Sequence, residues 1–487
     1  MLTKYIILIC YFAGLFLIGK LASGKINNIS DYFVGGKKLG YWVVAFSSRA
    51  TGASAWVLLG LTGMGAVYGI SAYWVAVGTT GGVVISWFFM ASKFKRLADQ
   101  YDSITIPDFL VSRFNSKGSF FRGMAATILS VFVVIYVSSQ IDATGTAFET
   151  FMGWDYFTGA LAGFIIVVLY TFSGGFVAVA WSDVFQGSIM LFGLVALPVA
   201  AISTIGGFGE ISASMAAIDP SLLSAWGKGG LTAENLARIV GFIMIGLGYL
   251  GSPQLFVRFL SIKDESEIKK GKWVSVILQL VMNVAAVSIG ILGRVILTEP
   301  GEELTSVLGN GGQDVLIKLS DYALPFFHGL YIAAVLAAIM STVDSLLVLA
   351  SSAVTRDFYQ KIFHPDMSDA KLVGMSKLVT LIMAGVALSV ALLVAFLVPG
   401  RTIFWFVIFG WSGLAASFCP VMILSLFWKN YSERGAIASM ITGFLCVPIF
   451  KFWATSLPEI GIYFKLIAEL LPSFVFALIA GILFNKK

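Results

Sequence analysis

The sequence is poor in the residues that most enzyme and metal sites need. Its 487 residues include only three cysteines and two histidines. The cysteines (Cys10, Cys419 and Cys446) all lie in apolar segments without disulfide or metal spacing, and His328 and His364 are far apart. A GxxxxGK[ST] phosphate loop and a GxSxG nucleophile sequence are also absent. The sequence therefore contains no motif that supports an enzyme.

Charged residues are scarce too, and this scarcity decides the class of protein. Asp, Glu, Lys and Arg make up 12% of the chain, whereas hydrophobic residues make up 58% and the mean hydropathy is +0.91. Apolar stretches of about 20 residues, enough to cross about 30 Å of hydrocarbon, recur along the whole length. We therefore expect an all-α polytopic membrane protein embedded in a lipid bilayer. The first stretch lacks a small-residue cleavage site after it, which favours a retained span over a signal peptide.

The apolar stretches predict thirteen spans. They cover approximately residues 3–22, 40–66, 72–92, 122–147, 157–178, 183–207, 236–260, 273–297, 326–353, 377–398, 402–428, 435–453 and 461–485. If the N-terminus lies outside, the inner connections hold most of the 32 Lys and Arg residues, Lys95 and Arg258 among them. This excess predicts an N-out, C-in topology. It also accounts for the formal charge of +6, so nucleic-acid binding is not indicated.

Two predicted spans are interrupted by small residues at matching places. The second span contains ATGAS (Ala50–Ser54) and the seventh contains IGLGYLGSP (Ile245–Pro253). Five spans begin at each break, and an odd offset reverses the second set relative to the first. Paired broken helices in inverted halves are typical of a transporter with its binding site near mid-membrane. The alternative, that small residues only let helices pack closely, fits one such stretch better than two.

Broken helices expose backbone carbonyls, and the ninth predicted span offers polar groups to complement them. Ala338, Ser341, Thr342 and Ser345 fall within an arc of about 100° on a helix. An unpaired carbonyl in hydrocarbon costs several kcal/mol, whereas hard oxygen ligands suit a cation such as Na⁺. Alternatively, the hydroxyls only bond back to the preceding turn.

Acidic residues inside spans are candidates for cation handling. Asp344 lies one turn from Ser341, and Asp183 lies at the predicted inner start of the sixth span. Asp183 either caps that helix or belongs to a cation site or exit path. Asp142, nearer the outer end of the fourth span, either binds an amine of a solute or faces a wet vestibule.

Aromatic and amide side chains near the breaks are candidates for solute binding. Tyr136 and Gln140 share one face of the fourth span. Tyr249, in the second break, can close over a small solute while its hydroxyl stays hydrogen-bonded. Trp56, just beyond the first break, either contributes to this site or only packs.

These residues carry a resemblance to the sodium/solute symporter family, and most to its sodium/proline symporter branch. The similar segments are DYFVGGKKLG (Asp31–Gly40), SGGFVAVAWSDVFQ (Ser173–Gln186), GLGYLGSPQLFVRF (Gly246–Phe259) and LAAIMSTVDSLLVLASSAVTRDFY (Leu336–Tyr359). The resemblance implies one transporter domain with a LeuT-like 5+5 inverted repeat. The repeats would span approximately 40–207 and 236–428, with flanking helices at 1–22 and 435–485.

The resemblance also assigns residues. It places Na⁺ between the carbonyls of Ala50, Ala53 and Ala338 and the hydroxyls of Ser341 and Thr342. A second cation site would use Ser341, Asp344 and Ser345, with Asp183 opposite. Tyr136 and Tyr249 match aromatic positions of proline symporters. The sequence departs from some of these at Gly52, where they carry Asp, and at Ile245, where they carry Trp. Arg49 is unexpected, and we expect it to snorkel inward or to pair with Asp183.

We therefore expect a Na⁺-coupled symporter that brings proline or a related amino acid across the cytoplasmic membrane, functioning as a monomer. A sugar, sialic acid or another carboxylate is an alternative solute. Proton coupling is a further alternative, because Asp142, Asp183 and Asp344 could relay protons. A channel or a sensor is disfavoured, because the sequence shows neither a ring-forming filter nor an appended signalling domain.

Overall fold

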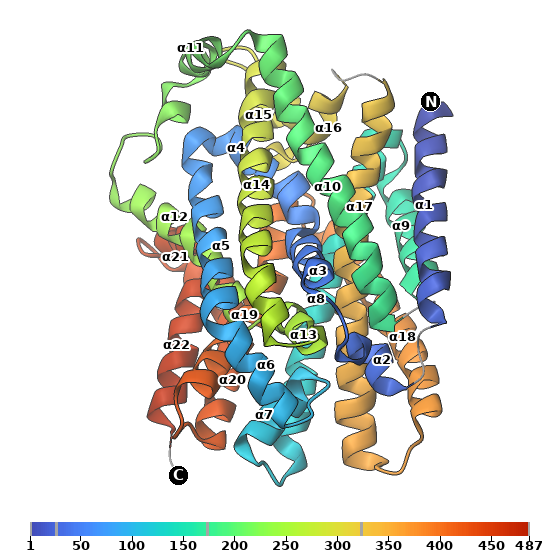
Figure 1. Cartoon of the computed structure of the whole chain (residues 1–487). Coiled ribbons are helices and arrows are strands. Elements are labelled where there is room, and N and C mark those ends of the chain that lie inside the picture. Colours follow the sequence, from blue (N-terminus) through green and yellow to red (C-terminus); the bar gives the residue numbers. More distant parts are fainter. Residues whose placement is uncertain (1, 25–27, 172–174, 322–324, 486–487) are drawn as a thin grey trace.

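A computed structural model describes residues 2–24, 28–171, 175–321 and 325–485, and these residues are almost entirely helical. Figure 1 shows long helices running between two ends of the molecule, with the N-terminus at one end and the C-terminus at the other. The long continuous helices are α1 (Leu2–Ser23), α8 (Ser119–Met152), α9 (Tyr156–Thr171), α10 (Gly175–Ile205), α14 (Glu265–Leu297), α17 (Pro325–Ser352), α18 (Asp369–Leu397), α19 (Ile403–Phe427), α20 (Glu433–Pro448) and α22 (Leu470–Leu483).

Two crossings are discontinuous, as the sequence predicts. In the first, α3 (Tyr41–Ala55) is followed by a π-helical turn (Trp56–Leu61) and by α4 (Thr62–Tyr68). In the second, α12 (Ala233–Met244) passes through a 3₁₀ segment (Ile245–Leu250) into α13 (Pro253–Ser261). The chain returns after α4 through α5 (Tyr73–Ile85) and α6 (Ala91–Gln100).

Short helices lie in the predicted connections. They are α2 (Ile29–Val34), α7 (Ile106–Phe114), α11 (Phe208–Ile218), α15 (Leu304–Leu308) and α16 (Val315–Ser320). A further short helix, α21 (Gly461–Ile467), lies at the start of the thirteenth predicted span, 461–485. The α7 helix is capped by the Thr105 hydroxyl, which accepts the Asp108 amide at 3.0 Å, with Pro107 in the first turn.

Burial separates a central group of helices from those that face lipid. The most apolar 18 residues of the stretch His328–Phe363, which contains most of α17, are all buried inside the protein. Only 28% of the corresponding residues are buried in α1 and α18. Because these outer helices are strongly apolar and still exposed, they suit contact with hydrocarbon rather than water. The helices that carry the candidate site therefore lie at the centre.

Several predicted boundaries shift. Within the described residues ten helical stretches are long and apolar enough to span a membrane, or eleven when α21 and α22, bent by 90°, count as one. The stretch Tyr41–Gln100 contains two predicted spans, between which Gly69 has a positive φ of 56°. The predicted end of the fifth span at 178 is wrong, because α9 ends at Thr171 and α10 begins at Gly175, whose φ is +54°. Part of that prediction, 172–174, lies outside the described residues.

Two basic residues assigned to inner connections are instead inside the protein. Arg258 belongs to α13 and is fully buried, and Lys95 of α6 is 1% exposed. Lys95 lies 2.9 Å from the Asp99 carboxylate and also donates to the Leu260 carbonyl. The sequence prediction was wrong here because the sequence alone does not distinguish a basic residue in a loop from one buried inside the protein. The remaining bias still predicts N-out.

Glycines let the central helices touch backbone to backbone. A methyl group added at Gly290 of α14 would lie 1.9 Å from the Thr62 carbonyl of α4, and one at Gly65 of α4 would lie 2.3 Å from the Val287 carbonyl. The 3₁₀ segment packs as closely on α5, where an added methyl at Gly246 would lie 2.0 Å from the Gly78 carbonyl. Small residues at helix contacts are the usual way in which membrane helices approach closely.

This packing predicts the effect of a single methyl group. Gly290→Ala should lower the free energy of unfolding by at least about 1–3 kcal/mol, because the clash involves rigid backbone. Thermal unfolding of the purified protein in detergent measures the change. Gly385→Ala in α18 is a matched control, since nothing lies within 4 Å of the position of its added methyl. Equal midpoints for both variants would contradict the close α4–α14 contact.

Candidate functional site

The first break falls on Ser54, the last residue of ATGAS. Ser54 has φ 46° and ψ −170°, which a residue with a side chain adopts at a cost of about 1–3 kcal/mol. Side chains supply partners to the backbone groups beside it, one from α8 and one from the same broken helix. The Ala55 amide donates to the side-chain oxygen of Gln140 at 3.0 Å, and the Trp56 indole donates to the Gly52 carbonyl at 2.9 Å. Gln140 of α8 therefore completes the broken helix.

The second break is completed by α19 in a comparable way. Gly251 has a φ of 156°, which requires glycine. The Trp411 indole donates to the Ile245 carbonyl at 3.3 Å, and the Cys419 thiol donates to the Gly248 carbonyl at 3.5 Å. A methyl group at Gly248 would lie 2.3 Å from the Trp411 ring. Glycine therefore lets the indole approach the open backbone.

The predicted hydroxyl stripe of α17 faces the first break. The Ser341 hydroxyl lies 3.3 Å from the Ala50 carbonyl and 3.1 Å from the Ala338 carbonyl. The Thr342 hydroxyl lies 3.0 Å from the Ala338 carbonyl and 3.1 Å from that of Thr51. Both hydroxyls thus bond back to the preceding turn, as the alternative interpretation held, and they also reach α3.

These oxygens fit a sodium ion by their chemistry. Carbonyl and hydroxyl oxygens are the hard, uncharged ligands that an alkali cation accepts. The structure brings Ala50, Ala338, Ser341 and Thr342 together. Ala53 differs, because its carbonyl accepts the Trp56 amide within its own turn. The carbonyl beside Thr342 is that of Thr51, which the sequence did not single out.

The position predicted for a second cation contains a guanidinium group. Arg258 is 3.1 Å from the Asp183 carboxylate and donates to the hydroxyls of Thr51 and Ser345. It also donates to the Ser47 hydroxyl at 3.1 Å and to the Gln254 carbonyl at 2.6 Å. The group links α3, α10, α13 and α17. The positive charge bound to Asp183 and Ser345 in this structure is therefore the guanidinium of Arg258.

Asp183 lies deeper in its helix than the sequence placed it, and Asp344 is buried inside the ninth predicted span as expected. Asp183 is fully buried and more than two turns into α10, so its possible role as a helix cap is wrong. Its carboxylate accepts from Ser47 and Arg258. Asp344 is also fully buried, and within the described part of the chain neither of its carboxyl oxygens has a hydrogen-bond partner.

Arg49 neither snorkels inward nor pairs with Asp183. It is 3% exposed, donates to the side-chain oxygen of Gln279 at 2.6 Å, and lies 5.1 Å from the centre of the Tyr249 ring. The expectation failed because Arg258 already binds Asp183. Arg49 instead turns toward α14 and the second break.

The predicted solute-binding residues Tyr136, Gln140, Tyr249 and Trp56 lie buried beside the two breaks. Tyr136 lies 3.5 Å from the Ser54 hydroxyl, and its ring meets Trp411 edge to face. Tyr249 also packs on Trp411, with ring centres 5.1 Å apart. Trp56 meets Phe404 edge to face. These aromatic side chains and Gln140 are at most 3% exposed, so this conformation shields them from water.

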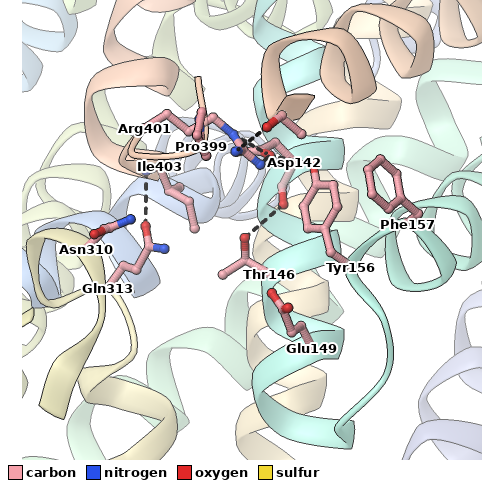
Figure 2. A pocket seen from close by; sticks show the side chains of 11 residues that line it. Asp142, Thr146, Glu149, Tyr156, Phe157, Asn310, Gln313, Pro399, Arg401 and Ile403 are labelled. Carbon is pink, nitrogen blue, oxygen red and sulfur yellow. Dashed lines mark hydrogen bonds and ion pairs between the residues drawn. The ribbon is translucent and has the colours of Figure 1, made fainter. Parts of the chain in front are cut away.

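Asp142 belongs to a different place, the cavity shown in Figure 2. It forms an ion pair with Arg401, whose Nε lies 2.9 Å away, and it accepts the Tyr156 hydroxyl at 2.6 Å. The cavity has a volume of about 260 Å³ and includes Glu149, Asn310 and Gln313 in its lining. This position agrees with the expected wet vestibule rather than with an amine ligand at the breaks.

Charges also join the helices near the opposite end. Arg122 of α8 bridges Asp108 of α7 and Asp357, which follows α17, and Arg356 lies 3.1 Å from Asp108. Burial alone would raise the pKa of Asp108, but Arg356 and Arg122 outweigh it and hold that pKa below its usual value.

Sequence reasoning missed several residues of this region, including Thr51, Arg258, Gln279, Arg401 and Trp411. Gln279 could have been found, because an amide in the apolar run VILQLVMNV needs a partner. Arg258 could also have been found, because it lies within the predicted span 236–260, where a charged residue needs a partner. The other three lack such a signal, since their importance depends on which helix lies opposite.

Comparisons with known proteins agree with this geometry. The sequence profile of the Sodium:solute symporter family matches residues 32–443. The chain belongs to this family. It is therefore a membrane transporter and not an enzyme.

Relatives support the assignment over nearly the whole chain. An osmoregulated proline transporter of Bacillus subtilis is 34% identical over 97% of this chain and 92% of that protein. The sodium/proline symporter of Escherichia coli is 32% identical over 99% of this chain and 93% of that protein.

Among solved structures, a Na⁺-coupled sialic acid symporter matches with a TM-score of 0.79 at 20% identity, over 99% and 97% of the two chains. The nucleobase-cation symporter Mhp1 matches with a TM-score of 0.53 at 16% identity, over 93% and 92%. Both structures show the LeuT-like fold.

The Arg258–Asp183 pair predicts strong coupling between the two residues. Arg258→Met should cost about 3–5 kcal/mol, because it leaves Asp183 as an uncompensated buried charge. Adding Asp183→Asn should recover much of that loss. Thermal unfolding of the single and double variants gives the coupling energy.

Arg96→Met serves as a control, since Arg96 pairs with Glu265 on the solvent-exposed surface, where an ion pair contributes little to stability. A double variant no more stable than Arg258→Met alone would contradict the pairing.

Proposed function

We propose that this protein imports proline, or a closely related amino acid, together with Na⁺. The observation that carries the proposal is the meeting of the Ser341 and Thr342 hydroxyls with carbonyls of the first break. Family membership supports the coupling ion, and the names of the most similar relatives support the solute.

The sodium site consists of the Ala50, Thr51 and Ala338 carbonyls and the Ser341 and Thr342 hydroxyls, with Ala53 available through its second lone pair. Bound Na⁺ supplies a positive charge that these oxygens share, and it joins α3 to α17. The hydroxyl protons, which now point at carbonyls, turn away so that oxygen lone pairs face the ion.

A single Na⁺ accompanies each solute in this proposal. A second cation among Asp183, Asp344 and Ser345 would have to displace the guanidinium of Arg258 and its contacts to Thr51, Ser345 and Asp183. Removing one partner of a buried ion pair is costly. Asp183 instead holds α13 beside the ion's path.

The solute binds between the two breaks, beside Tyr136, Gln140, Tyr249 and Trp56. The aromatic rings enclose its apolar part, and the amides and carbonyls of the breaks meet its polar groups. The inverted repeats 40–207 and 236–428 then rock about this site.

Two charge clusters close the ends of the pathway in turn. The Asp142–Arg401 pair joins α8 to the segment before α19, and Arg122, Asp108 and Asp357 join α7 and α8 to the end of α17. With the N-terminus outside, the first cluster is the outer closure and the second the inner one. The protein lies in the cytoplasmic membrane and acts as a monomer, and the Na⁺ gradient supplies about 2.3 kcal/mol per charge for each 100 mV.

Uptake into proteoliposomes tests this function. Labelled proline should accumulate under an inward Na⁺ gradient and not under a pH gradient alone, with one Na⁺ entering for each proline. Sialic acid, a sugar and other amino acids serve as competing solutes. Uptake driven by pH and indifferent to Na⁺ would refute sodium coupling, and a ratio of two would refute the single site.

The sodium site predicts the effect of one hydroxyl. Thr342→Val keeps the shape of the side chain and removes one oxygen ligand, so the Na⁺ concentration for half-maximal uptake should rise at least about tenfold, as expected for a lost ligand worth about 1.5–3 kcal/mol. Uptake measured against Na⁺ concentration gives this value.

Thr380→Val in α18 is the matched control, because Thr380 is also buried and bonds back to the preceding turn, to the Ser376 carbonyl. The site assignment fails if both variants show the same sodium dependence.

A further inference from the structure

Arg49 is a buried cation whose neighbours are all uncharged. Its guanidinium contacts the Gln279 amide oxygen, the Ser48 hydroxyl and the face of the Tyr249 ring. Within the described part of the chain no carboxylate lies within ion-pair distance of Arg49. Arg258, equally buried, has Asp183 as its counter-ion.

A buried charge without a counter-ion is unusual, because desolvation costs several kcal/mol unless an opposite charge offsets it. The amide and the aromatic face offset part of that cost. These neutral groups do not cancel the positive charge of Arg49, so an anion that balances it must come from outside the protein.

The position of Arg49 shows where such an anion would come from. The guanidinium lies against Tyr249, the aromatic residue of the second break, and Gln279 also donates to the Tyr249 hydroxyl at 3.4 Å. Gly52, three residues after Arg49, faces the same ring, and a methyl added there would make ordinary contact with it at 3.6 Å. Arg49 and Gly52 therefore both border the aromatic ring of the second break.

We propose that Arg49 binds the carboxylate of the transported solute. This inference rests on the proposed function, and it specifies the solute class as a carboxylate-bearing molecule such as a zwitterionic amino acid. A guanidinium binds a carboxylate through two parallel hydrogen bonds, which fixes the orientation as well as the charge. Glycine at position 52 keeps Arg49 available to the solute, because an acidic residue there would lie three residues further along the helix and neutralise the guanidinium.

The same contact couples the solute to the cation. Arg49 directly precedes Ala50, whose carbonyl belongs to the proposed sodium site, so its positive charge opposes Na⁺ binding. A bound carboxylate cancels that charge and raises the affinity for Na⁺. Linkage requires Na⁺ to raise the affinity for the carboxylate by the same factor.

Matched ligands test the inference on the purified full-length protein in Na⁺. Proline and prolinamide differ in the carboxylate, and titrating the thermal unfolding midpoint with each gives its affinity. Arg49→Gln keeps a donor for Gln279 and removes the charge. It should weaken proline binding roughly 10- to 100-fold and change prolinamide binding less than twofold.

Two further variants guard against a general loss of structure. Gly52→Asp retains Arg49 and adds an internal counter-ion, so it should also weaken proline selectively. Arg238→Gln is the matched control, because Arg238 likewise lies 5.2 Å from a tyrosine ring centre, that of Tyr68, and donates to an amide oxygen, that of Asn235. It should leave the proline-to-prolinamide ratio unchanged.

The outcomes separate this inference from the proposed function. Suppose that the unaltered protein binds proline and that Arg49→Gln still prefers proline to prolinamide. This result overturns the role of Arg49 and leaves the proposed function standing. Unaltered protein that binds neither proline nor a related amino acid overturns the proposed function. The Arg49 comparison is then made with the carboxylate that binds best and its amide, and equal affinity for the two overturns the inference as well.

Discussion

Inside a membrane every backbone group must find a partner within the protein, and two helices of this transporter break where that requirement is hardest to meet. The partners come from two other helices. Gln140 of α8 accepts the amide after the first break, and Trp411 and Cys419 of α19 donate to carbonyls of the second. Each unsatisfied group would cost several kcal/mol. The positions of α8 and α19 against the broken helices therefore decide which carbonyls are left for a cation.

Electrostatics at the centre of the protein follows from the same lack of water. Arg258 has a full set of partners, including Asp183, and ties four helices together. Such a network specifies one arrangement of helices more than it adds stability. Arg49 has only neutral neighbours. The contrast between these two arginines separates a structural charge from one available to a ligand.

Ion pairs between aspartate and arginine lie toward both ends of the bundle. Asp142 and Arg401 meet beside a cavity, whereas Asp108 lies between two arginines that keep its pKa low. Ion pairs next to water can open at modest cost, because solvent replaces the lost partner. Closures of this type suit a protein whose central site must face each side in turn.

The sequence by itself determined the class, the two breaks and the hydroxyl stripe, because hydropathy, glycine content and helical periodicity are properties of one segment at a time. The family resemblance grouped Ala50, Ala338, Ser341 and Thr342, and the structure places these residues within hydrogen-bonding distance of one another. Only the tertiary structure decided which partner each polar group meets. It put Thr51 beside Thr342, gave Asp183 to Arg258, and turned Arg49 toward Tyr249. These choices depend on the rotation and depth of one helix against another, which no single segment encodes.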